Sequence, residues 1–218
     1  MQACTFTADK SANVSVDGTG LILTAAAGAA VIGARATHGI LSTSLTHRTG
    51  FIFEATIDAM DATNKNISVG VANSSAVLTT LAGNQTNTSG YRVFDHLMER
   101  ENSGTDLVPT FAQAAVGDVL GVVLFLQQGQ TQAWCSIYKN GIEISSLSGS
   151  MVAGTYYPFI TLFDTGDQVT CNFGATPFTY GHLYSDNRRT PWAADPRPNA
   201  LATTKPKFNQ RSIGHIGL

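Results

Sequence analysis

The chain has 218 residues, of which 43% are hydrophobic and only 13% are charged, and its formal net charge is −2 at pH 7. This length suits one all-β domain with extensions or at most two small domains, and the hydrophobic content supports a sizeable core, which excludes a globally disordered chain. The near-neutral charge excludes a whole-protein field that would favour nucleic acid or an anionic membrane.

The first predicted elements are short strands separated by turns. Residues 14–16 and 21–23 are apolar runs on either side of Asp17-Gly18, a tight-turn pair, and together they predict a hairpin. Residues 25–36 are rich in alanine, but two glycines interrupt them, so we interpret this stretch as strand and loop and not as a helix. The first ten residues lack the basic start and the continuous apolar stretch of a secretory signal, so we expect no export.

The middle of the chain contains the clearest strand patterns. Residues 51–58 alternate aromatic or aliphatic side chains with small or polar ones, as a half-buried strand does, and residues 67–72 predict a second strand. Residues 119–126 are continuously apolar, which is consistent with a strand buried on both faces of a sandwich. This run is far shorter than the ~18 residues needed to span a bilayer, so we expect no membrane partner.

Hairpin signals follow in the C-terminal half. Residues 133–138 predict a strand, and Asn140-Gly141 supplies the two positive φ angles that a type I′ turn requires. Residues 159–163 and 168–173 flank Asp164-Thr165-Gly166-Asp167, and this arrangement predicts another hairpin. Many short strands broken by frequent turns are typical of an antiparallel β-sandwich.

The composition changes near Gly181. Residues 1–180 contain 7 Lys/Arg and 13 Asp/Glu, a net charge of −6, whereas residues 181–218 contain 6 Lys/Arg and 2 Asp/Glu, a net charge of +4. Four of the seven prolines also lie in this last segment, which argues against regular structure there. We therefore expect residues 181–218 to form an irregular, extended C-terminal docking arm and not a second domain.

Seven short motifs follow one another in the middle and C-terminal half of the chain. They are Gly50-Phe51-Ile52-Phe53-Glu54, Val69-Gly70-Val71-Ala72, Gly90-Tyr91, Gly117-Asp118-Val119-Leu120-Gly121, Asn140-Gly141, Tyr157-Pro158, and Asn172-Phe173-Gly174 with Pro177-Phe178. In this order, over about residues 50–180, they resemble a SPRY domain. The resemblance implies an all-β, antiparallel, concanavalin-like β-sandwich, to which residues 1–49 add an N-terminal strand segment. It also implies a binding or scaffolding module without a cofactor, and a structural role for Glu54 in pairing with or capping backbone.

The segment between Gly90-Tyr91 and Gly117 departs from the family. Many SPRY domains carry a Gly/Asp/Trp-rich stretch where this chain has residues 92–115, and in the family this region contributes to ligand-facing loops, so no known partner specificity transfers to this chain. Its large polar and aromatic residues are our candidates for a partner-binding loop, although Tyr91 also suits a core position: Tyr91, Arg92, Phe94, Asp95, His96, Glu99 and Arg100.

No motif predicts a catalytic, cofactor-binding or metal-binding residue. Glu54 and Asp58 are the nearest acidic pair on a predicted strand, but no supporting glycosidase motif accompanies them. The glycines of residues 117–121 lack the Lys-Ser/Thr of a P-loop, so we interpret the motif as a turn capped by Asp118. The chain has no Gly-x-Ser-x-Gly elbow. Its five histidines are scattered, without an i,i+4 pair: His38, His47, His96, His182 and His215.

The three cysteines are isolated and odd in number, which predicts neither a zinc site nor a redox motif. Cys135 and Cys171 each lie in a strand-like run, where a free cysteine acts as a small hydrophobic residue, and Cys4 lies near the start of the chain. This usage fits synthesis in reducing cytosol.

The C-terminal arm interleaves cations with aromatic residues. Three interpretations are open: an arm docked on an acidic neighbouring subunit or copy of the chain, a disordered tail, or a weak nucleic-acid arm. The first is favoured by the opposite charges of arm and body and by the apolar end of the chain. The candidate docking residues are Arg188, Arg189, Trp192, Lys205, Lys207, Phe208 and Arg211.

The accessory segments that often accompany eukaryotic SPRY domains are not recognisable in this chain. A nearly isolated SPRY domain with its own extensions is similar to bacterial or bacteriophage proteins, and by analogy we expect a virion component, made in the host cytoplasm, such as a decoration, fibre or tail-associated protein. Its partners would be neighbouring virion subunits or copies of itself. The alternatives are a glycan- or receptor-binding module at a fibre tip and a cytoplasmic peptide-binding adaptor.

Overall fold

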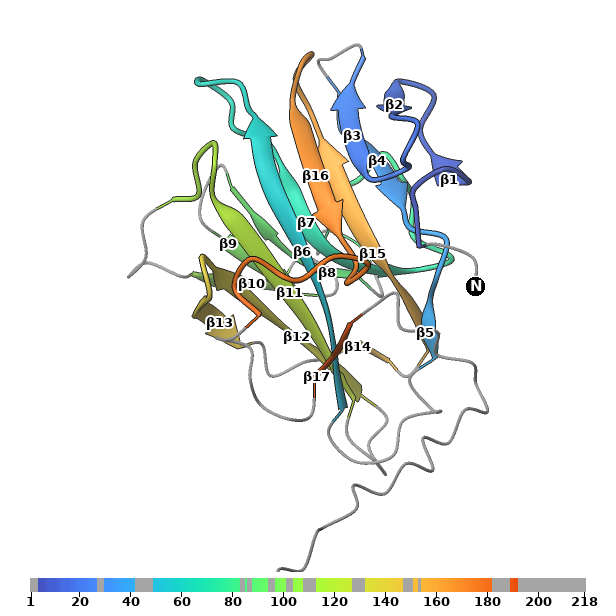
Figure 1. The fold of residues 1–218 in the computed structure, drawn as a ribbon, viewed down its shortest axis with the longest axis vertical. Coiled ribbons are helices and arrows are strands. Elements are labelled where there is room, and N and C mark those ends of the chain that lie inside the picture. Colours follow the sequence, from blue (N-terminus) through green and yellow to red (C-terminus); the bar gives the residue numbers. More distant parts are fainter. Residues whose placement is uncertain are drawn as a thin grey trace, which may run out of the picture.

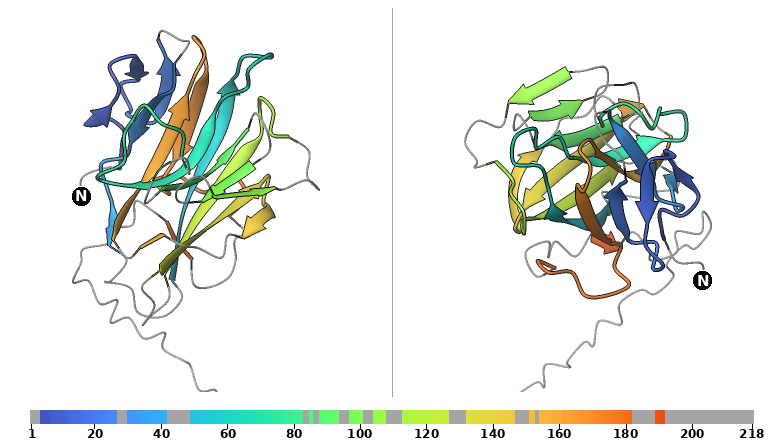
Figure 2. Two further views of the ribbon diagram at one scale, coloured as in Figure 1. Left: turned by 180° about the vertical axis from the view of Figure 1, so that it is seen from behind. Right: turned by 90° about the horizontal axis from the view of Figure 1, so that it is seen from above.

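Two β-sheets packed face to face make up the fold (Figures 1 and 2). The computed structural model describes residues 4–26, 30–41, 49–82, 85, 88–93, 97–100, 104–107, 113–126, 132–146, 151–152, 154–181 and 189–191. Across these ranges the secondary structure consists of strands and turns, and no helix could span a membrane. Every strand pairing is antiparallel except that of the last strand, so the expected all-β antiparallel sandwich is confirmed.

The first sheet has eight strands. Its order is β1 (Asp9–Lys10), β4 (Ile32–Arg35), β15 (Thr155–Leu162), β7 (Ser68–Asn73), β8 (Thr88–Arg92), β9 (Leu97–Arg100) and β10 (Gly104–Leu107), and β5 (Ile40–Leu41) also pairs with β15. Strands from the beginning, middle and end of the sequence are therefore neighbours in this sheet. The strand at β4 confirms that the alanine-rich stretch does not form a helix there.

The second sheet has nine strands. Its order is β13 (Ile142–Ser146), β12 (Gln132–Lys139), β11 (Val119–Leu126), β6 (Thr49–Ala59), β16 (Gln168–Asn172), β3 (Ile22–Ala25) and β2 (Val14–Val16). Two short strands pair off this path: β14 (Met151–Val152) with β12, and β17 (Arg189–Pro191) with β6. The strands predicted at residues 51–58, 119–126 and 133–138 correspond to β6, β11 and β12.

Two of the predicted hairpins are confirmed. Strands β12 and β13 form a hairpin through Asn140 and Gly141, whose φ angles of 50° and 81° are those of the expected type I′ turn. Strands β2 and β3 also pair, but their turn runs from Asp17 to Ile22, and the positive φ belongs to Gly20 (77°) instead of to Gly18. The Asp17 carboxylate accepts hydrogen bonds from the backbone N–H groups of three turn residues: Thr19, Leu21 and Ile22.

The third predicted hairpin, at residues 164–167, is wrong. Strand β15 belongs to the first sheet and β16 to the second, so this turn carries the chain from one sheet to the other. The buried carboxylate of Asp167 stabilises the turn between the sheets. It accepts hydrogen bonds from the backbone N–H groups of Phe163 (3.2 Å), Asp164 (2.9 Å) and Asp61 (2.9 Å). The turn signal was correct, but the residues of a turn do not specify which strand the chain joins next.

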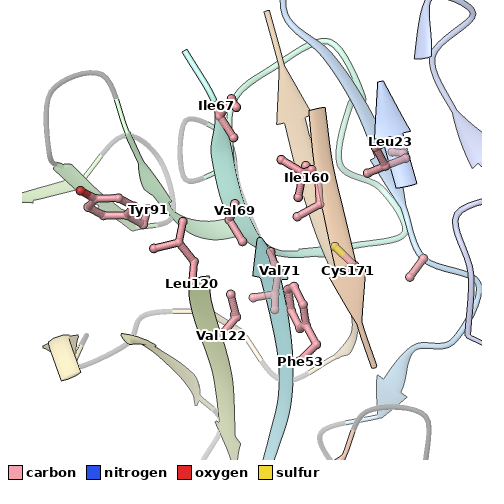
Figure 3. Packing of buried hydrophobic residues seen from close by; sticks show 14 of the residues in the cluster. Leu23, Phe53, Ile67, Val69, Val71, Tyr91, Leu120, Val122, Ile160 and Cys171 are labelled. Atoms are coloured by element: carbon pink, nitrogen blue, oxygen red, sulfur yellow. The ribbon is translucent and has the colours of Figure 1, made fainter. Parts of the chain in front are cut away.

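The main core lies between the sheets and is formed by the inward-facing residues of both (Figure 3). Phe53 and Ile57 of β6 alternate with outward-facing residues, as the period of a strand requires. Strand β11 is buried on both faces, as its apolar run predicted: Leu120 and Leu124 belong to the main core, and Val123 belongs to a second cluster on the outer face.

The outer face of the first sheet is closed by a tightly packed loop. Gly70 and Gly90 are register partners at this face, and a Cβ atom on Gly70 would lie only 2.0 Å from the carbonyl oxygen of Ser89. Nearby, Phe159 packs with small and apolar residues of β7 and the following loop, namely Ala72, Ala76, Leu78 and Ala82. The motif glycine at position 70 is therefore needed because the neighbouring strand approaches it closely.

Candidate binding surface and C-terminal strap

The predicted partner-binding residues that the structure describes lie in strands. Tyr91 lies in β8, opposite Val69 of β7, and its side chain is 1% exposed in the main core (Figure 3). Its position in the sheet leaves it unable to contact a partner in this conformation. Tyr91 therefore has the core role that its sequence position also allowed.

Of the remaining predicted residues of this segment, three lie in strands and three lie outside the described residues. Arg92 ends β8, and Glu99 and Arg100 lie in β9, which pairs with β10 in an antiparallel hairpin at the edge of the first sheet. Phe94, Asp95 and His96 lie outside the described residues. Residues 97–100 therefore form a strand where a loop was expected, and a role for Glu99 and Arg100 in partner binding stays a prediction.

The C-terminal arm begins on the chain's own second sheet. Arg189 is the first residue of β17, which pairs in parallel with Gly50, Phe51 and Ile52 of β6. The expectation that the arm lacks regular structure is therefore wrong for residues 189–191. The other candidate docking residues, Arg188, Trp192, Lys205, Lys207, Phe208 and Arg211, lie outside the described part of the chain.

Between β16 and β17, residues 174–181 form a segment that we call the C-terminal strap. In Figure 1 the strap, in orange, crosses in front of β6 and β11 on the outer face of the second sheet. Its Phe178 and Tyr180 pack against three outward-facing residues of that sheet: Ile52, Val123 and Tyr138. The strap therefore covers the apolar part of this face.

Glu54 fastens the strap to the sheet. Its carboxylate, on a residue that is 2% exposed, accepts hydrogen bonds from the backbone N–H of Thr179 (2.7 Å) and of Tyr180 (2.9 Å). A buried carboxylate needs such donors, because an ionised group without them would pay the full cost of desolvation. The structural role that the family resemblance implied for Glu54 is confirmed, and the backbone that it binds is now identified.

Asn172 fixes the beginning of the strap. Its side-chain amide donates to the carbonyl oxygens of Thr176 and Pro177, both at 3.2 Å, and its side-chain oxygen accepts from the backbone N–H of Gly174 at 2.8 Å. The Asn-Phe-Gly and Pro-Phe motifs of the sequence therefore act together, since the first anchors the segment in which the second lies. Composition alone did not indicate this connection.

The Asp118 turn is a structural capping site, as predicted. Its carboxylate accepts hydrogen bonds from the backbone N–H of Ala115 (2.9 Å) and the side-chain amide of Asn140 (2.7 Å), and it pairs with the Lys139 ammonium at 3.1 Å. Burial by itself would raise the pKa of Asp118, but these hydrogen bonds and the Lys139 charge outweigh it and lower the pKa. Asp118 therefore fastens the start of β11 to the turn of the β12–β13 hairpin.

The nearest acidic pair of the sequence is engaged in structure. Glu54 and Asp58 both face outward from β6, but Glu54 binds the strap and Asp58 accepts a hydrogen bond from the Thr170 hydroxyl at 2.6 Å. His38, one of the scattered histidines, lies within hydrogen-bonding distance of the Thr37 hydroxyl. Among the residues that the structure describes, no group of three His, Cys, Asp or Glu side chains could hold a metal ion.

All three cysteines are buried and free. Burial raises the pKa of Cys4 to about 12, against a smaller effect of a hydrogen bond with the backbone of His38. Burial likewise raises the pKa of Cys135 to about 12 and, together with the nearby Cys4 and Asp58, raises that of Cys171 well above its usual range. Cys135 and Cys171 therefore act as small hydrophobic core residues, as expected, and Cys4 has joined them.

Solved structures of SPRY domains have a similar architecture. No family model and no curated protein matches the chain. A crystal structure of a human SPRY domain is similar with a TM-score of 0.61 and 18% identity, over 76% of this chain and 98% of that one. The crystal structure of the SPRY domain of human HERC1 is similar with a TM-score of 0.57 and 20% identity, over 75% of this chain and 94% of that one. At these identities the similarity shows the fold, and the chain has the SPRY β-sandwich fold.

Proposed function

We propose that this chain with a SPRY fold is a non-enzymatic protein-binding module, and that it serves as a structural component of a bacteriophage virion. The observation that carries the first part is the fold itself, which matches nearly the whole of a human SPRY domain. The carboxylates that could have suggested catalysis support it, because Glu54, Asp58 and Asp118 are each occupied by hydrogen bonds within the sandwich.

The virion assignment rests on the organisation of the chain. A body with few charges and many Ser, Thr, Asn and Gly residues suits lasting contacts with neighbouring proteins, and the basic arm complements the acidic body of another copy. In this role the protein is made in the host cytoplasm and ends in the particle as a decoration, fibre or tail-associated protein. Its partners are neighbouring virion subunits or copies of itself.

The test is the solution mass of the full-length chain and of a variant that ends at Gly181, measured by light scattering after size exclusion. This truncation keeps the backbone N–H groups of Thr179 and Tyr180 that bind Glu54, so the strap stays in place and only β17 and the tail are lost. We expect the full-length chain to assemble and the truncated chain to be a monomer. Two monomers would contradict assembly through the arm and would favour a peptide-binding adaptor or a glycan-binding module.

A further inference from the structure

Strand β6 has a backbone edge that its main neighbours do not cover. On one side β11 pairs with β6 from Thr49 to Thr56. On the other side β16 pairs with β6 only from Ala59 to Glu54, because β16 ends at Asn172. On that side the backbone of residues 50–52 is therefore not paired with β16, and it pairs with β17 instead. We call this three-residue edge the β6 slot.

The contact that fills the β6 slot is small. It consists of three register pairs in parallel orientation, and parallel pairing is slightly less stable per residue than antiparallel pairing. Backbone groups make these contacts, so any identical strand can replace β17 without loss of a bond. Exchange of an identical element between copies is a low-cost route to a dimer.

The chain between the strap and β17 is long enough to reach another molecule. The strap is fastened to the sheet up to Tyr180 by Glu54. Residues 182–188 follow, and a fully extended chain spans at most about 3.6 Å per residue, so Arg189 can lie up to about 29 Å from Gly181. A β6 slot on an adjacent copy is within that distance when the two second sheets lie near each other.

The charge of the remainder of the chain suits the acidic body of a second copy as well as the chain's own body. Residues 192–218 contain 4 Lys/Arg and 1 Asp/Glu, a net charge of +3, whereas residues 1–191 contain 9 Lys/Arg and 14 Asp/Glu, a net charge of −5. The tail also carries Trp192 and Phe208.

We propose that β17 is exchanged between two copies of this chain, so that Arg189–Pro191 of each copy pairs with Gly50–Ile52 of the other. This inference rests on the proposed assembly through copies of the chain. Reciprocal exchange gives a two-fold interface in which the same surface of both copies is used, and it places each basic tail beside the acidic body of its partner. The strap stays on its own sheet and forms the fixed base from which the strand is exchanged.

The test is a disulfide between copies. Gly50 and Arg189 are register partners, so two single variants, Gly50→Cys and Arg189→Cys, are co-expressed, purified together and oxidised. Exchange predicts a disulfide-linked dimer at twice the chain mass of 23.0 kDa on a non-reducing gel. The native cysteines give little background because all three are buried. The matched control replaces Gly50→Cys by Ser15→Cys, at an exposed position of β2, and is expected to give no dimer.

A second variant keeps the test decisive if a cysteine at Gly50 disturbs folding. Thr190→Pro removes the central backbone N–H of β17. If β17 is exchanged, the full-length Thr190→Pro chain should lose the dimeric mass in light scattering. Two results would overturn the exchange and leave assembly by other contacts intact. The first is a Thr190→Pro chain that keeps the full assembly mass. The second is an intramolecular disulfide in the double variant Gly50→Cys/Arg189→Cys, with no disulfide between the two mixed single variants. A monomeric full-length chain would overturn both the exchange and the proposed assembly through the arm.

Discussion

At the scale of single residues, Glu54 connects two distant parts of the sequence. Its two hydrogen bonds join β6 to Thr179 and Tyr180, more than a hundred residues later in the chain. The motif in which it lies was visible in the sequence, and so was its structural character. The partner was not visible, because two backbone N–H groups have no side-chain signature.

Replacing this carboxylate should weaken the sandwich. In Glu54→Gln the amide group presents N–H atoms to one of the two backbone donors, so one hydrogen bond is lost and two donors face each other in a buried site. We expect the free energy of unfolding in urea to fall by about 2 kcal/mol, as for hydrogen bonds to charged groups. Glu143→Gln, at an exposed position, is the control and should leave stability unchanged. Equal losses in both variants would contradict the strap-fastening role.

Two buried hydroxyl groups lower the stability of the sandwich, so replacing one of them should raise it. Ser68 and Thr161 are register partners in the first sheet, both fully buried, and neither hydroxyl has a hydrogen-bond partner among the residues that the structure describes. Thr161→Val should therefore raise the free energy of unfolding by about 1 kcal/mol, since it removes a buried polar group that is not satisfied. The matched control is Thr170→Val, which removes a hydroxyl that donates to Asp58 and should lower stability. A loss of stability in Thr161→Val would show that its hydroxyl does find a partner.

The buried thiols predict a pH dependence. Cys4 and Cys135 have pKa values raised to about 12 from the usual 9.0, so the folded state keeps protons that the unfolded state releases above pH 9. The contribution of these thiols to the free energy of unfolding is therefore fully present below pH 9. It falls as the pH rises beyond 9, by about 1.4 kcal/mol per pH unit for each thiol. Urea unfolding under reducing conditions between pH 8 and 11 measures this slope. The Cys135→Ala variant should show a shallower slope, and an unchanged slope would assign the loss to other groups.

At the scale of elements, local turn chemistry predicted reversals of the chain better than it predicted pairings. Asn140-Gly141 closes a hairpin as expected, because a type I′ turn joins two strands that are adjacent in the same sheet. The turn at residues 164–167 has similar residues but joins different sheets. What distinguishes them is the long-range bond from Asp61 to Asp167, which a local pattern does not contain.

A glycine exchange tests the type I′ turn. Gly141 has a φ of 81°, so Gly141→Ala forces a side chain into the left-handed region and should cost about 1–2 kcal/mol of unfolding free energy. Gly18→Ala is the control, since a Cβ atom there meets nothing within 4 Å and Gly18 is not among the positive-φ residues. We expect Gly18→Ala to be neutral within about 0.5 kcal/mol. Equal effects in urea unfolding would argue against the turn.

At the scale of the whole molecule, the strap packs on the sandwich. It closes the outer face of the second sheet, just as the loop around Ala76 closes that of the first. This explains why the apolar run of β11 is continuous: Val123 faces the strap while its neighbours face the core. Both outer faces of the central strands are thus covered.

Two truncations separate the strap from the tail. A chain ending at Gly181 keeps the bonds to Glu54, and we expect its free energy of unfolding to stay within about 1 kcal/mol of the full-length value. A chain ending at Gly174 uncovers Ile52, Val123 and Tyr138, so it should lose about 1.5–3 kcal/mol of unfolding free energy for each large side chain exposed. It should also bind a hydrophobic dye. Equal stability of the two chains would exclude the strap from the folded domain.

The sequence by itself determined the all-β class, the strands with a clear apolar pattern and the resemblance to a SPRY fold, because side-chain alternation, apolar runs and turn residues are local properties that each segment carries alone. Only the tertiary structure decided which strands became neighbours, that residues 97–100 form an edge hairpin, that Tyr91 is buried, and that β17 lies on β6. These features depend on backbone groups of distant segments that meet when two sheets pack. A backbone N–H is the same in nearly every residue, so its partner is set by the fold.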